Sequence, residues 1–432
     1  MEMARYEVYT SVDIGSKYLK GAVVAVKGDT FEVLGYAEVP SRGIDSGDIK
    51  DVSAFKESFN RILEELARQY PRISKTELLV SFSSDGFTLD THRESFQLVE
   101  EDEEGEVLIT EELLEDLKYE IYSKLSGPEV GKRVLNIFTR GFTLNGNRVV
   151  INPIDMSARE IEIEVAAVRV DYSAGEALRA TLEDMVGTDP EMFATPISAA
   201  EGALTPTEKD SGVVLVDLGY NFTTVVPYLN NMPVDVRYVP LGIKNVVKDI
   251  VYVFRTSFDE AEMMLRNNGF AVYDPSSDLE SEIEYREIDG RTIKKVSLGK
   301  FALVVNARLM EIFNKVRRVY KDLERNVPAY RENGIPGGVV LTGGGARIKR
   351  IEDLATQVLR TNVRIGKFVT SFPIDHERVV GGEEAVENPA FTPVFGNVVS
   401  HFKSYSEIVK SSSTTKSSGI WKGLKKLLKN LF

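Results

Sequence analysis

The strongest constraint on the fold is a type of segment that occurs twice. Residues 10–40 read TSVDIGSKYLKGAVVAVKGDTFEVLGYAEVP, and residues 213–242 read VVLVDLGYNFTTVVPYLNNMPVDVRYVPLG. In each, an apolar run ends in Val-Asp-apolar-Gly, and two further strand-like runs follow. The two Asp–Gly pairs, Asp13/Gly15 and Asp217/Gly219, lie 204 residues apart. We interpret them as the duplicated β-β-β starts of two lobes, each followed by helices; the alternative is two unrelated hairpins.

Length and composition agree with a globular protein of more than one domain. The chain has 432 residues, of which 43% are hydrophobic and 28% charged, and 432 residues exceed one ordinary core. It contains no cysteine, which excludes a disulfide framework and a thiolate metal site. The first residues lack the pattern of a secretory signal, and no run approaches the ~18 apolar residues that span a membrane.

Periodicity predicts the remaining elements of both lobes. Asn145-Gly146 and Asp289-Gly290 indicate two further hairpins. The expected helices cover residues 51–70, 109–125, 172–186, 245–254, 259–267 and 298–323, and residues 78–83 and 160–170 are expected strands. Residues 335–359 predict a strand, a glycine turn and then a helix.

Three glycine-bearing turns could contact the phosphates of a nucleotide, because glycine lets phosphates approach backbone N–H groups closely. The first turn holds Asp13, Gly15, Ser16 and Lys17, with Lys20 beyond it; the second holds Asp217, Gly219, Tyr220, Asn221 and Thr223; the third is Gly343, Gly344 and Gly345. The helix expected after the third turn would add a favourable dipole for an anion. One such turn alone is usually only a hairpin.

Two Asp-x-Gly turns and a strand–GGG–helix segment, in this order, resemble the actin-like ATPase fold of actins, sugar kinases and chaperone ATPases. That resemblance implies an α/β protein whose two lobes close on ATP. It also implies that Asp13 and Asp217 lie near Mg²⁺ through water, which suits a cation that retains its waters. The Walker lysine motif is absent, so the chain is not a P-loop protein.

Within this superfamily the chain resembles the bacterial cell-division family FtsA. SVDIGSKYLKG is followed by SRGIDSGDIKD at residues 41–51, NPIDMSAREIEIEV occupies 152–165, and VVLTGGGARIKRIEDLA matches the family's adenine-side turn. Asp155 and Ala158 stand where the family usually has glycine. A linker rich in serine and a basic amphipathic end complete the resemblance.

The family layout implies six segments, including a small domain called 1C inserted in the first lobe. The expected subdomains are 1A at residues 1–84 and 166–195, 1C at 85–165, 2A at 196–244 and 328–403, and 2B at 245–327. A flexible linker is expected at 404–418 and a membrane-targeting amphipathic helix at 419–432.

The resemblance also implies an adenosine site and a slow reaction. Glu262 stands where related prokaryotic actins contact adenosine, although Leu265 replaces their usual lysine, and Arg347 follows the glycines Gly343, Gly344 and Gly345. Thr195 occupies the position at which those relatives place a water-activating carboxylate, and a hydroxyl cannot act as that base. We therefore expect at most a slow ATPase, with ATP acting as a clamp for lobe angle and polymerisation. No catalytic residue is assigned.

FtsA-like proteins bind the C-terminal peptide of FtsZ on subdomain 2B. Lys300, Arg308 and Lys315 share one side of the expected helix 298–323, and Lys294 and Lys295 precede it. A basic row suits a peptide that is partly acidic. The alternative is a solvated helix face without a partner.

The last residues form a basic, amphipathic segment on an acidic protein. The chain has 53 basic and 66 acidic residues, but six lysines and no acid lie after residue 409, leaving 47 basic against 66 acidic residues before it. With 100° per residue, the apolar side chains fall within an arc of about 140° and the lysines opposite or at its edge. The apolar set is Ile420, Trp421, Leu424, Leu427, Leu428, Leu431 and Phe432, and the lysines are Lys422, Lys425, Lys426 and Lys429. This pattern predicts a helix that lies on anionic lipid; packing on the protein's own core is the alternative.

The first hypothesis is therefore an adaptor that polymerises, binds FtsZ and anchors it at the division site, on the cytoplasmic face of the cell membrane. Its expected partners are FtsZ, further copies of itself, anionic inner-membrane lipids and later division proteins. An acidic body argues against nucleic acid as a partner. A small-molecule kinase of the same fold and an assembly scaffold of another membrane complex remain the alternatives.

Overall fold

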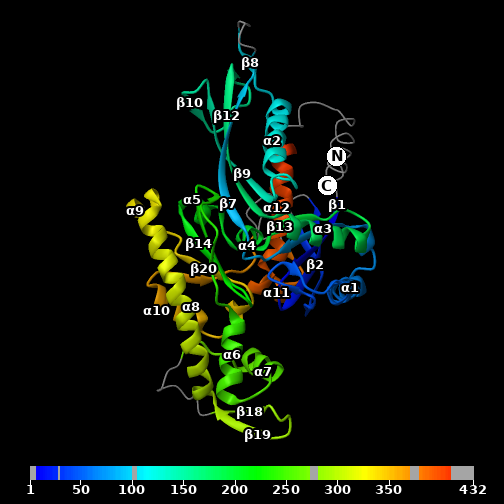
Figure 1. Ribbon diagram of the computed structural model, residues 1–432, viewed down its shortest axis with the longest axis vertical. Helices are drawn as coiled ribbons and strands as arrows, with labels where there is room; N and C mark the ends of the chain where they lie inside the picture. The colour runs from blue at the N-terminus through cyan, green and yellow to red at the C-terminus, as the bar shows by residue number, and fades with distance from the viewer. Residues whose placement is uncertain (1–5, 28–29, 100–104, 273–280, 370–378, 410–432) are drawn as a thin grey trace.

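The computed structural model describes residues 6–27, 30–99, 105–272, 281–369 and 379–409. Two six-stranded sheets lie in the middle of an elongated molecule (Figure 1). A four-stranded sheet with helix α2 (Glu111–Leu125) lies at one end, and α6 (Ile243–Phe254), α7 (Phe258–Asn268) and a hairpin lie at the other. Within these ranges, no helix is long and apolar enough to cross a membrane.

The first sheet has the order β13-β6-β1-β2-β3-β22. It comprises β1 (Tyr6–Ile14), β2 (Tyr18–Lys27), β3 (Thr30–Pro40), β6 (Glu77–Phe82), β13 (Glu191–Ala194) and β22 (Val379–Val380). β1, β2 and β3 are antiparallel, whereas β6 is parallel to β1. Both faces are buried: Val23 packs in the same core as α1 (Val52–Gln69), and Val24 packs with α12 (Thr392–Val409) on the other side. This is the alternation expected of a strand covered on both sides.

The second sheet repeats that plan and confirms the predicted duplication. It comprises β14 (Val213–Leu218), β15 (Thr223–Leu229), β16 (Met232–Pro233), β17 (Arg237–Val239), β20 (Val339–Thr342) and β21 (Val363–Ile365). β14 pairs antiparallel with β15 and parallel with β20, just as β1 pairs with β2 and β6. The third strand of this copy is split into β16 and β17, both paired with β15. Apolar residues of α6, α8 (Leu298–Asn326) and α10 (Ile351–Leu359) form one core with β14.

The inserted unit has a core of its own. Its sheet has the order β10-β9-β12-β7, formed by β7 (Thr88–Gln97), β9 (Lys132–Leu144), β10 (Arg148–Val150) and β12 (Glu160–Asp171). A short pair, β8 (Val107–Leu108) and β11 (Ser157–Ala158), lies beside it. Asn145 and Gly146 confirm the hairpin predicted there, and their φ values of 50° and 69° are those of a type I′ turn.

The remaining elements connect these sheets. They are β4 (Ile44–Asp45), β5 (Asp48–Ile49), η1 (Ile73–Lys75), α3 (Tyr172–Val186), α4 (Thr195–Ala203), α5 (Pro206–Ser211), β18 (Glu282–Arg286), β19 (Ile293–Ser297), α9 (Pro328–Asn333), η2 (Gly344–Arg347), α11 (Glu383–Val386) and η4 (Pro389–Phe391). The long helix predicted from residue 298 is confirmed as α8, which continues to Asn326. β18 and β19 confirm the hairpin at Asp289-Gly290.

One boundary differs from the sequence-based division, which assigned all of 328–403 to the second lobe. Residues from β22 onward pack on the first lobe instead: β22 pairs with β3, and α12 covers the first sheet. α12 crosses α4 so closely that a Cβ on Gly396 would lie 1.7 Å from the Ser198 carbonyl oxygen. Two glycines, Gly202 and Gly396, make this crossing possible, and no local sequence pattern indicates which lobe the last helix joins.

Buried charges also fix α12. The Glu201 carboxylate on α4 is buried and pairs with Lys209 of α5 at 2.8 Å and with Lys403 of α12. Burial alone would raise the pKa of Glu201, but the two ammonium groups lower it to about 2. The carboxylate is therefore ionised, and its two partners join three helices.

Candidate functional site

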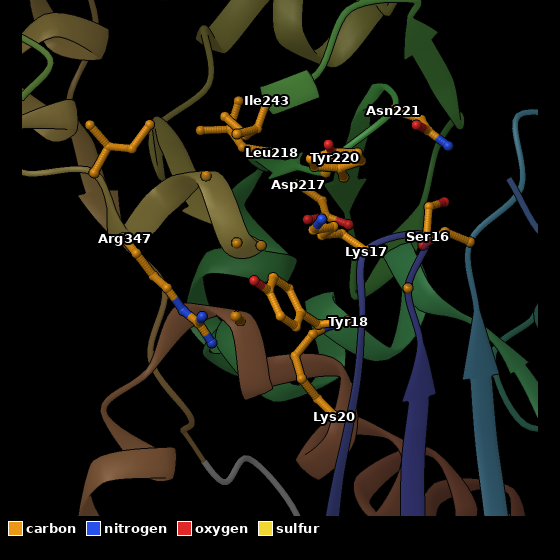
Figure 2. Close-up of a pocket in the computed structure, with 18 of the residues that line it drawn as sticks. Ser16, Lys17, Tyr18, Lys20, Asp217, Leu218, Tyr220, Asn221, Ile243 and Arg347 are labelled. Atoms are coloured by element: carbon orange, nitrogen blue, oxygen red, sulfur yellow. The ribbon is translucent and has the colours of Figure 1, made fainter. Parts of the chain in front are cut away.

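A cleft of about 240 Å³ opens between the two lobes, lined by residues of both (Figure 2). It brings together almost all of the residues predicted to surround a nucleotide. From the first turn come Asp13, Gly15, Ser16, Lys17 and Lys20; from the second Asp217, Gly219, Tyr220 and Asn221; and from the adenosine set Glu262, Gly343, Gly344, Gly345 and Arg347. Thr223 does not line the cleft, because its buried hydroxyl donates to the Leu241 carbonyl oxygen.

The first two turns have the same geometry. A Cβ on Gly15 would lie 2.8 Å from the Tyr18 carbonyl oxygen, and a Cβ on Gly219 would lie 2.7 Å from the Phe222 carbonyl oxygen. In both cases the obstructing atom is backbone three residues ahead in the same turn, so it cannot move aside. Glycine is therefore required by the tightness of each hairpin, which explains why the Asp-x-Gly pattern occurs twice.

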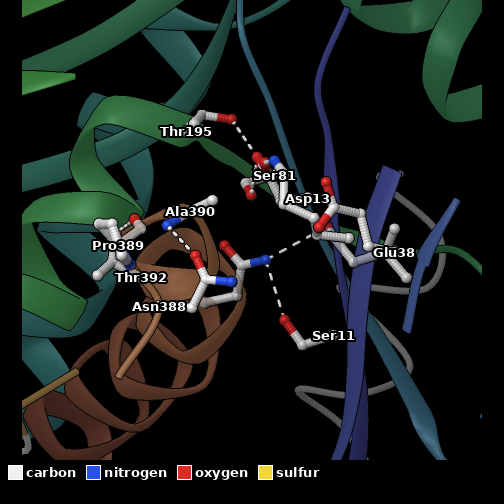
Figure 3. Close-up of polar contacts among 12 residues, drawn as sticks. Ser11, Asp13, Glu38, Ser81, Thr195, Asn388, Pro389, Ala390 and Thr392 are labelled. Atoms are coloured by element: carbon white, nitrogen blue, oxygen red, sulfur yellow. Dashed lines mark hydrogen bonds and ion pairs between the residues drawn. The ribbon is translucent and has the colours of Figure 1, made fainter. Parts of the chain in front are cut away.

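Asp13 is held by three side chains. Its Oδ2 accepts from Lys20 Nζ at 2.5 Å, and its Oδ1 accepts from Ser81 Oγ at 3.0 Å and from Thr195 Oγ1 at 2.7 Å. Figure 3 shows Ser81 and Thr195 beside this carboxylate. Thr195, at the position where relatives were expected to carry a carboxylate, therefore positions Asp13.

Asp217 has no comparable support. Among the described residues, no donor is hydrogen-bonded to its carboxylate, although the side chain is only 8% exposed. Burial raises the pKa of Asp217 to about 6, the negative charge of Asp13 adds to the rise, and Lys20 partly offsets it. A cation between the two carboxylates would remove this repulsion. Two carboxylates at a cleft fit Mg²⁺, which binds through one or two carboxylates and keeps several of its waters.

The third turn follows β20 and contacts Asp217. Gly343 has a φ of +83°, and a Cβ on it would lie 2.1 Å from Asp217 Oδ1. A Cβ on Gly344 would meet no atom within 4 Å, so this residue leaves room in the cleft. The expected α-helix does not start directly after the glycines: a single turn, η2, comes first, and α10 begins only at Ile351. The helix dipole that we expected here is therefore displaced along the chain.

Polar contacts join the two lobes across the cleft. Lys17 Nζ lies 2.5 Å from Glu262 Oε2, and the Tyr220 hydroxyl donates to Glu262 Oε1 at 2.5 Å. This hydrogen bond, together with burial as the largest cause, raises the pKa of Tyr220. Glu262, predicted to contact adenosine, is thus paired with a residue of the opposite lobe.

Other cross-lobe contacts were not predicted from the sequence. Arg347 forms a two-pronged pair with Glu38 of β3 at 3.0 and 2.8 Å. Burial raises the pKa of Glu38, but Arg347, with Lys20 and Arg266, outweighs it and holds the pKa below its usual value. Arg266 also stacks over the Tyr18 ring, with 4.9 Å from the guanidinium carbon to the ring centroid. These residues come from distant segments, and no motif marks them.

A further polar contact between the lobes lies at the edge of the cleft. The Asn221 amide donates to Ser46 Oγ at 3.1 Å and also to the Asp45 carboxylate. The second hairpin turn is thereby joined to the β4–β5 turn of the first lobe.

The basic residues predicted to bind a peptide are mostly paired. Arg308 donates to Asp249 and Glu311, Lys294 pairs with Glu287, and Lys295 lies 3.3 Å from both Glu282 and Glu284. Among the described residues, Lys300 and Lys315 have no ion-pair partner. The predicted membrane segment, residues 419–432, lies outside the described part of the chain.

The comparisons with known proteins support one family. The model of the family described as cell division protein FtsA matches residues 214–396. The cell division protein FtsA of Bacillus subtilis is 26% identical over 369 residues, covering 84% of this chain and 79% of that protein. The FtsA of Borreliella burgdorferi is 25% identical over 392 residues, covering 90% of this chain and 89% of that protein.

Solved structures show the same fold at lower identity. A chain of the PilM-PilN type IV pilus biogenesis complex has a TM-score of 0.58 and 16% identity, covering 91% of this chain and 98% of that chain. MreB5 of Spiroplasma citri bound to ADP has a TM-score of 0.54 and 14% identity, covering 94% of this chain and 98% of that chain.

The raised pKa of Asp217 predicts a measurable pH dependence of stability. The folded pKa of about 6 exceeds the unfolded value of 3.8, so the folded state binds the proton more tightly. Stability is therefore lost as pH rises through this window, by up to about 3 kcal/mol. Asp217→Asn should gain stability over the native chain between pH 5 and pH 7.5, measured by urea unfolding in EDTA. Asp116→Asn, at an exposed site on α2, is the control; equal pH dependence in all three proteins would contradict the prediction.

Proposed function

Because the chain is a relative of the FtsA cell division proteins and has the actin-like ATPase fold, we propose that it is an ATP-binding protein of cell division. In this proposal it polymerises and links FtsZ filaments to the cytoplasmic face of the cell membrane. The observation that carries the nucleotide part is the cleft in which two identical hairpin turns, two buried carboxylates and a third glycine turn converge.

Each part of the cleft suits one part of the ligand. The backbone N–H groups of the turns at Gly15 and Gly219 would take phosphate oxygens, with Lys17 and Lys20 supplying positive charge. Asp13 and Asp217 would hold Mg²⁺ through water, which neutralises phosphate charge. Adenosine would lie along Gly343, Gly344, Gly345, Glu262 and Arg347.

The cross-lobe contacts support a role for ATP as a clamp. Lys17 is paired with Glu262 and Arg347 with Glu38, although all four residues line the cleft that the nucleotide would enter. ATP would exchange these pairs for its own contacts and so set the angle between the lobes. Thr195 stands where a water-activating carboxylate was expected, and its hydroxyl donates to Asp13. A hydroxyl cannot act as that base, so hydrolysis would be slow.

ATP binding can be tested at a glycine that has room around it. The Cβ that Gly344→Val adds meets no protein atom within 4 Å, so we expect normal folding but at least tenfold weaker binding of fluorescent ATP with Mg²⁺. Gly141→Val in β9 is the matched control, because a Cβ there also meets nothing within 4 Å. Equal ATP affinity in both variants would place the nucleotide elsewhere.

The proposed FtsZ-peptide surface is centred on the start of α8. Lys300 is exposed and unpaired within the described chain, and it shares its side of the helix with exposed Leu303 (50%) and Met310 (41%). Ile293 of β19 is 62% exposed. A lysine beside exposed apolar side chains suits an amphipathic peptide with acidic positions. Arg308 is less suited to a charge-reversal test, because an acid at that position would lie beside Asp249 and Glu311.

The proposed peptide surface can be tested by reversing the charge of Lys300. Lys300→Glu should weaken binding of a labelled FtsZ C-terminal peptide at least tenfold in fluorescence polarisation, because it replaces attraction by repulsion. Lys75→Glu, at an exposed site of the first lobe, should leave the affinity unchanged. If the two variants bind equally well, the peptide does not use this face of α8.

Residues 419–432 are the proposed membrane anchor, on the evidence of their sequence. Each lysine near an anionic surface contributes ~1 kcal/mol, and partly inserted apolar side chains add to this. Ordering a free segment costs ~1 kcal/mol or more per residue, so one copy would bind weakly. A polymer that carries many copies would bind firmly by avidity, which gives polymerisation a role in attachment.

Sedimentation with anionic vesicles tests the anchor. In the presence of ATP, the full chain should pellet with the vesicles and carry the FtsZ peptide with it, whereas a chain ending at Ser418 should stay in solution. The truncated chain should still bind the peptide. Equal sedimentation of the two chains would contradict the anchor without affecting the ATP and peptide assignments.

A further inference from the structure

A second group of potential metal ligands lies at the opposite end of the first sheet from the cleft. It consists of Glu77, Glu191 and His401, at the start of β6, at the start of β13 and on α12. One ligand atom from each residue lies within 4.8 Å of the other two. His401 Nδ1 is 2.6 Å from Glu191 Oε2. None of the three residues is among those that line the cleft.

The topology of the sheet explains why these side chains meet. β13 and β6 are parallel neighbours, with Glu191 opposite Leu79, and Glu77 precedes Leu79 by two residues. Side chains two residues apart on a strand point to the same face. Leu79 packs beneath α12 in a core with Val398, so this is the face that α12 covers. His401, one turn beyond Val398, therefore arrives above the two carboxylates.

Acidic charge exceeds basic charge around the buried His401. His401 is 9% exposed and Glu191 is half-buried, whereas Glu77 is exposed. Within the described residues, no lysine or arginine pairs with Glu77 or Glu191. Burial lowers the pKa of His401, but Glu191, with Glu77 and Glu7, raises it overall. Two carboxylates and one imidazole thus share a small space without a Lys or Arg counter-ion.

We propose that Glu77, Glu191 and His401 form a binding site for a divalent transition-metal ion of the Zn²⁺ type. An imidazole nitrogen and carboxylate oxygens are ligand types that this ion accepts, and three protein ligands with one water complete a tetrahedron. In a tetrahedron, bonds of about 2.0–2.2 Å place neighbouring ligand atoms about 3.3–3.6 Å apart. Glu77 is exposed and can rotate inward, and the His401–Glu191 hydrogen bond would give way to two bonds to the metal. Mg²⁺ and Ca²⁺ prefer sites made only of oxygen ligands and should bind poorly.

Metal binding here would have a structural consequence. The ion would fasten the middle of α12, at His401, to the first residues of β6 and β13. The same helix begins next to the cleft, where Pro393 and Ala390 contribute to the lining. A bound ion would therefore stabilise an element that reaches from the nucleotide cleft to the point where the described chain ends.

Titration of the full chain with Zn²⁺ alone, without nucleotide, tests the site by calorimetry. We expect one saturable site whose affinity falls at least tenfold in Glu77→Gln and in His401→Gln. His92→Gln is the matched control, since His92 is the other histidine in the described residues and lies on β7. The Zn²⁺ affinity of His92→Gln should equal that of the native chain. Because metal and proton compete for the imidazole, the affinity should also fall as pH is lowered to 5.5.

Glu77→Gln separates a metal site from a structural hydrogen bond. Glu77 is exposed, so this variant should melt at the native temperature in EDTA, yet lose the rise in melting temperature that Zn²⁺ gives the native chain. The absence of saturable Zn²⁺ binding would overturn the proposal. Zn²⁺ binding of native affinity in Glu77→Gln or in His401→Gln would overturn it as well.

Discussion

The two carboxylates at the bottom of the cleft, Asp13 and Asp217, are the constraint on which the rest of the site depends. Each ends the first strand of its sheet, and each is buried. Asp13 is compensated by Lys20, Ser81 and Thr195, whereas Asp217 is left with a pKa raised to about 6. A buried carboxylate without a donor is costly in a ligand-free protein. It is readily explained if a cation and phosphate groups belong between the lobes.

The cross-lobe pairs are contacts that a ligand in the cleft could replace. Lys17–Glu262, Arg347–Glu38 and the Asn221 contacts each include one residue from a turn at the cleft, whereas α4 and α12 form a tight crossing of two helices. Such partly exposed pairs are individually weak and can exchange for contacts to a nucleotide. The α4–α12 crossing is backbone against backbone and cannot. This division between fixed and exchangeable contacts is what a clamp driven by ligand binding requires.

Most residues that line the cleft could be predicted from the sequence, because the patterns that mark them are local. The hairpin turns at Gly15 and Gly219 require glycine for reasons confined to four residues, so the duplicated pattern could be recognised in the sequence. Glu262 was found only through a family resemblance, and its pairing with Lys17 was not anticipated. Glu38 and Arg266 were missed altogether, because they join the cleft from other elements. The basic row predicted on α8 stays a prediction, and its Arg308 is paired with an acidic neighbour, Asp249, that the sequence did not indicate.

The sequence by itself determined the repeated strand–turn–strand starts, the glycines at the three turns, the helix registers and the basic character of the last residues. These properties depend on backbone geometry and periodicity over a few residues. Only the tertiary structure decided that α12 returns to the first lobe, that Thr195 supports Asp13, and that Glu77, Glu191 and His401 meet at one point. Such contacts join segments that are distant along the chain, and sheet register and helix crossing, rather than local pattern, bring them together.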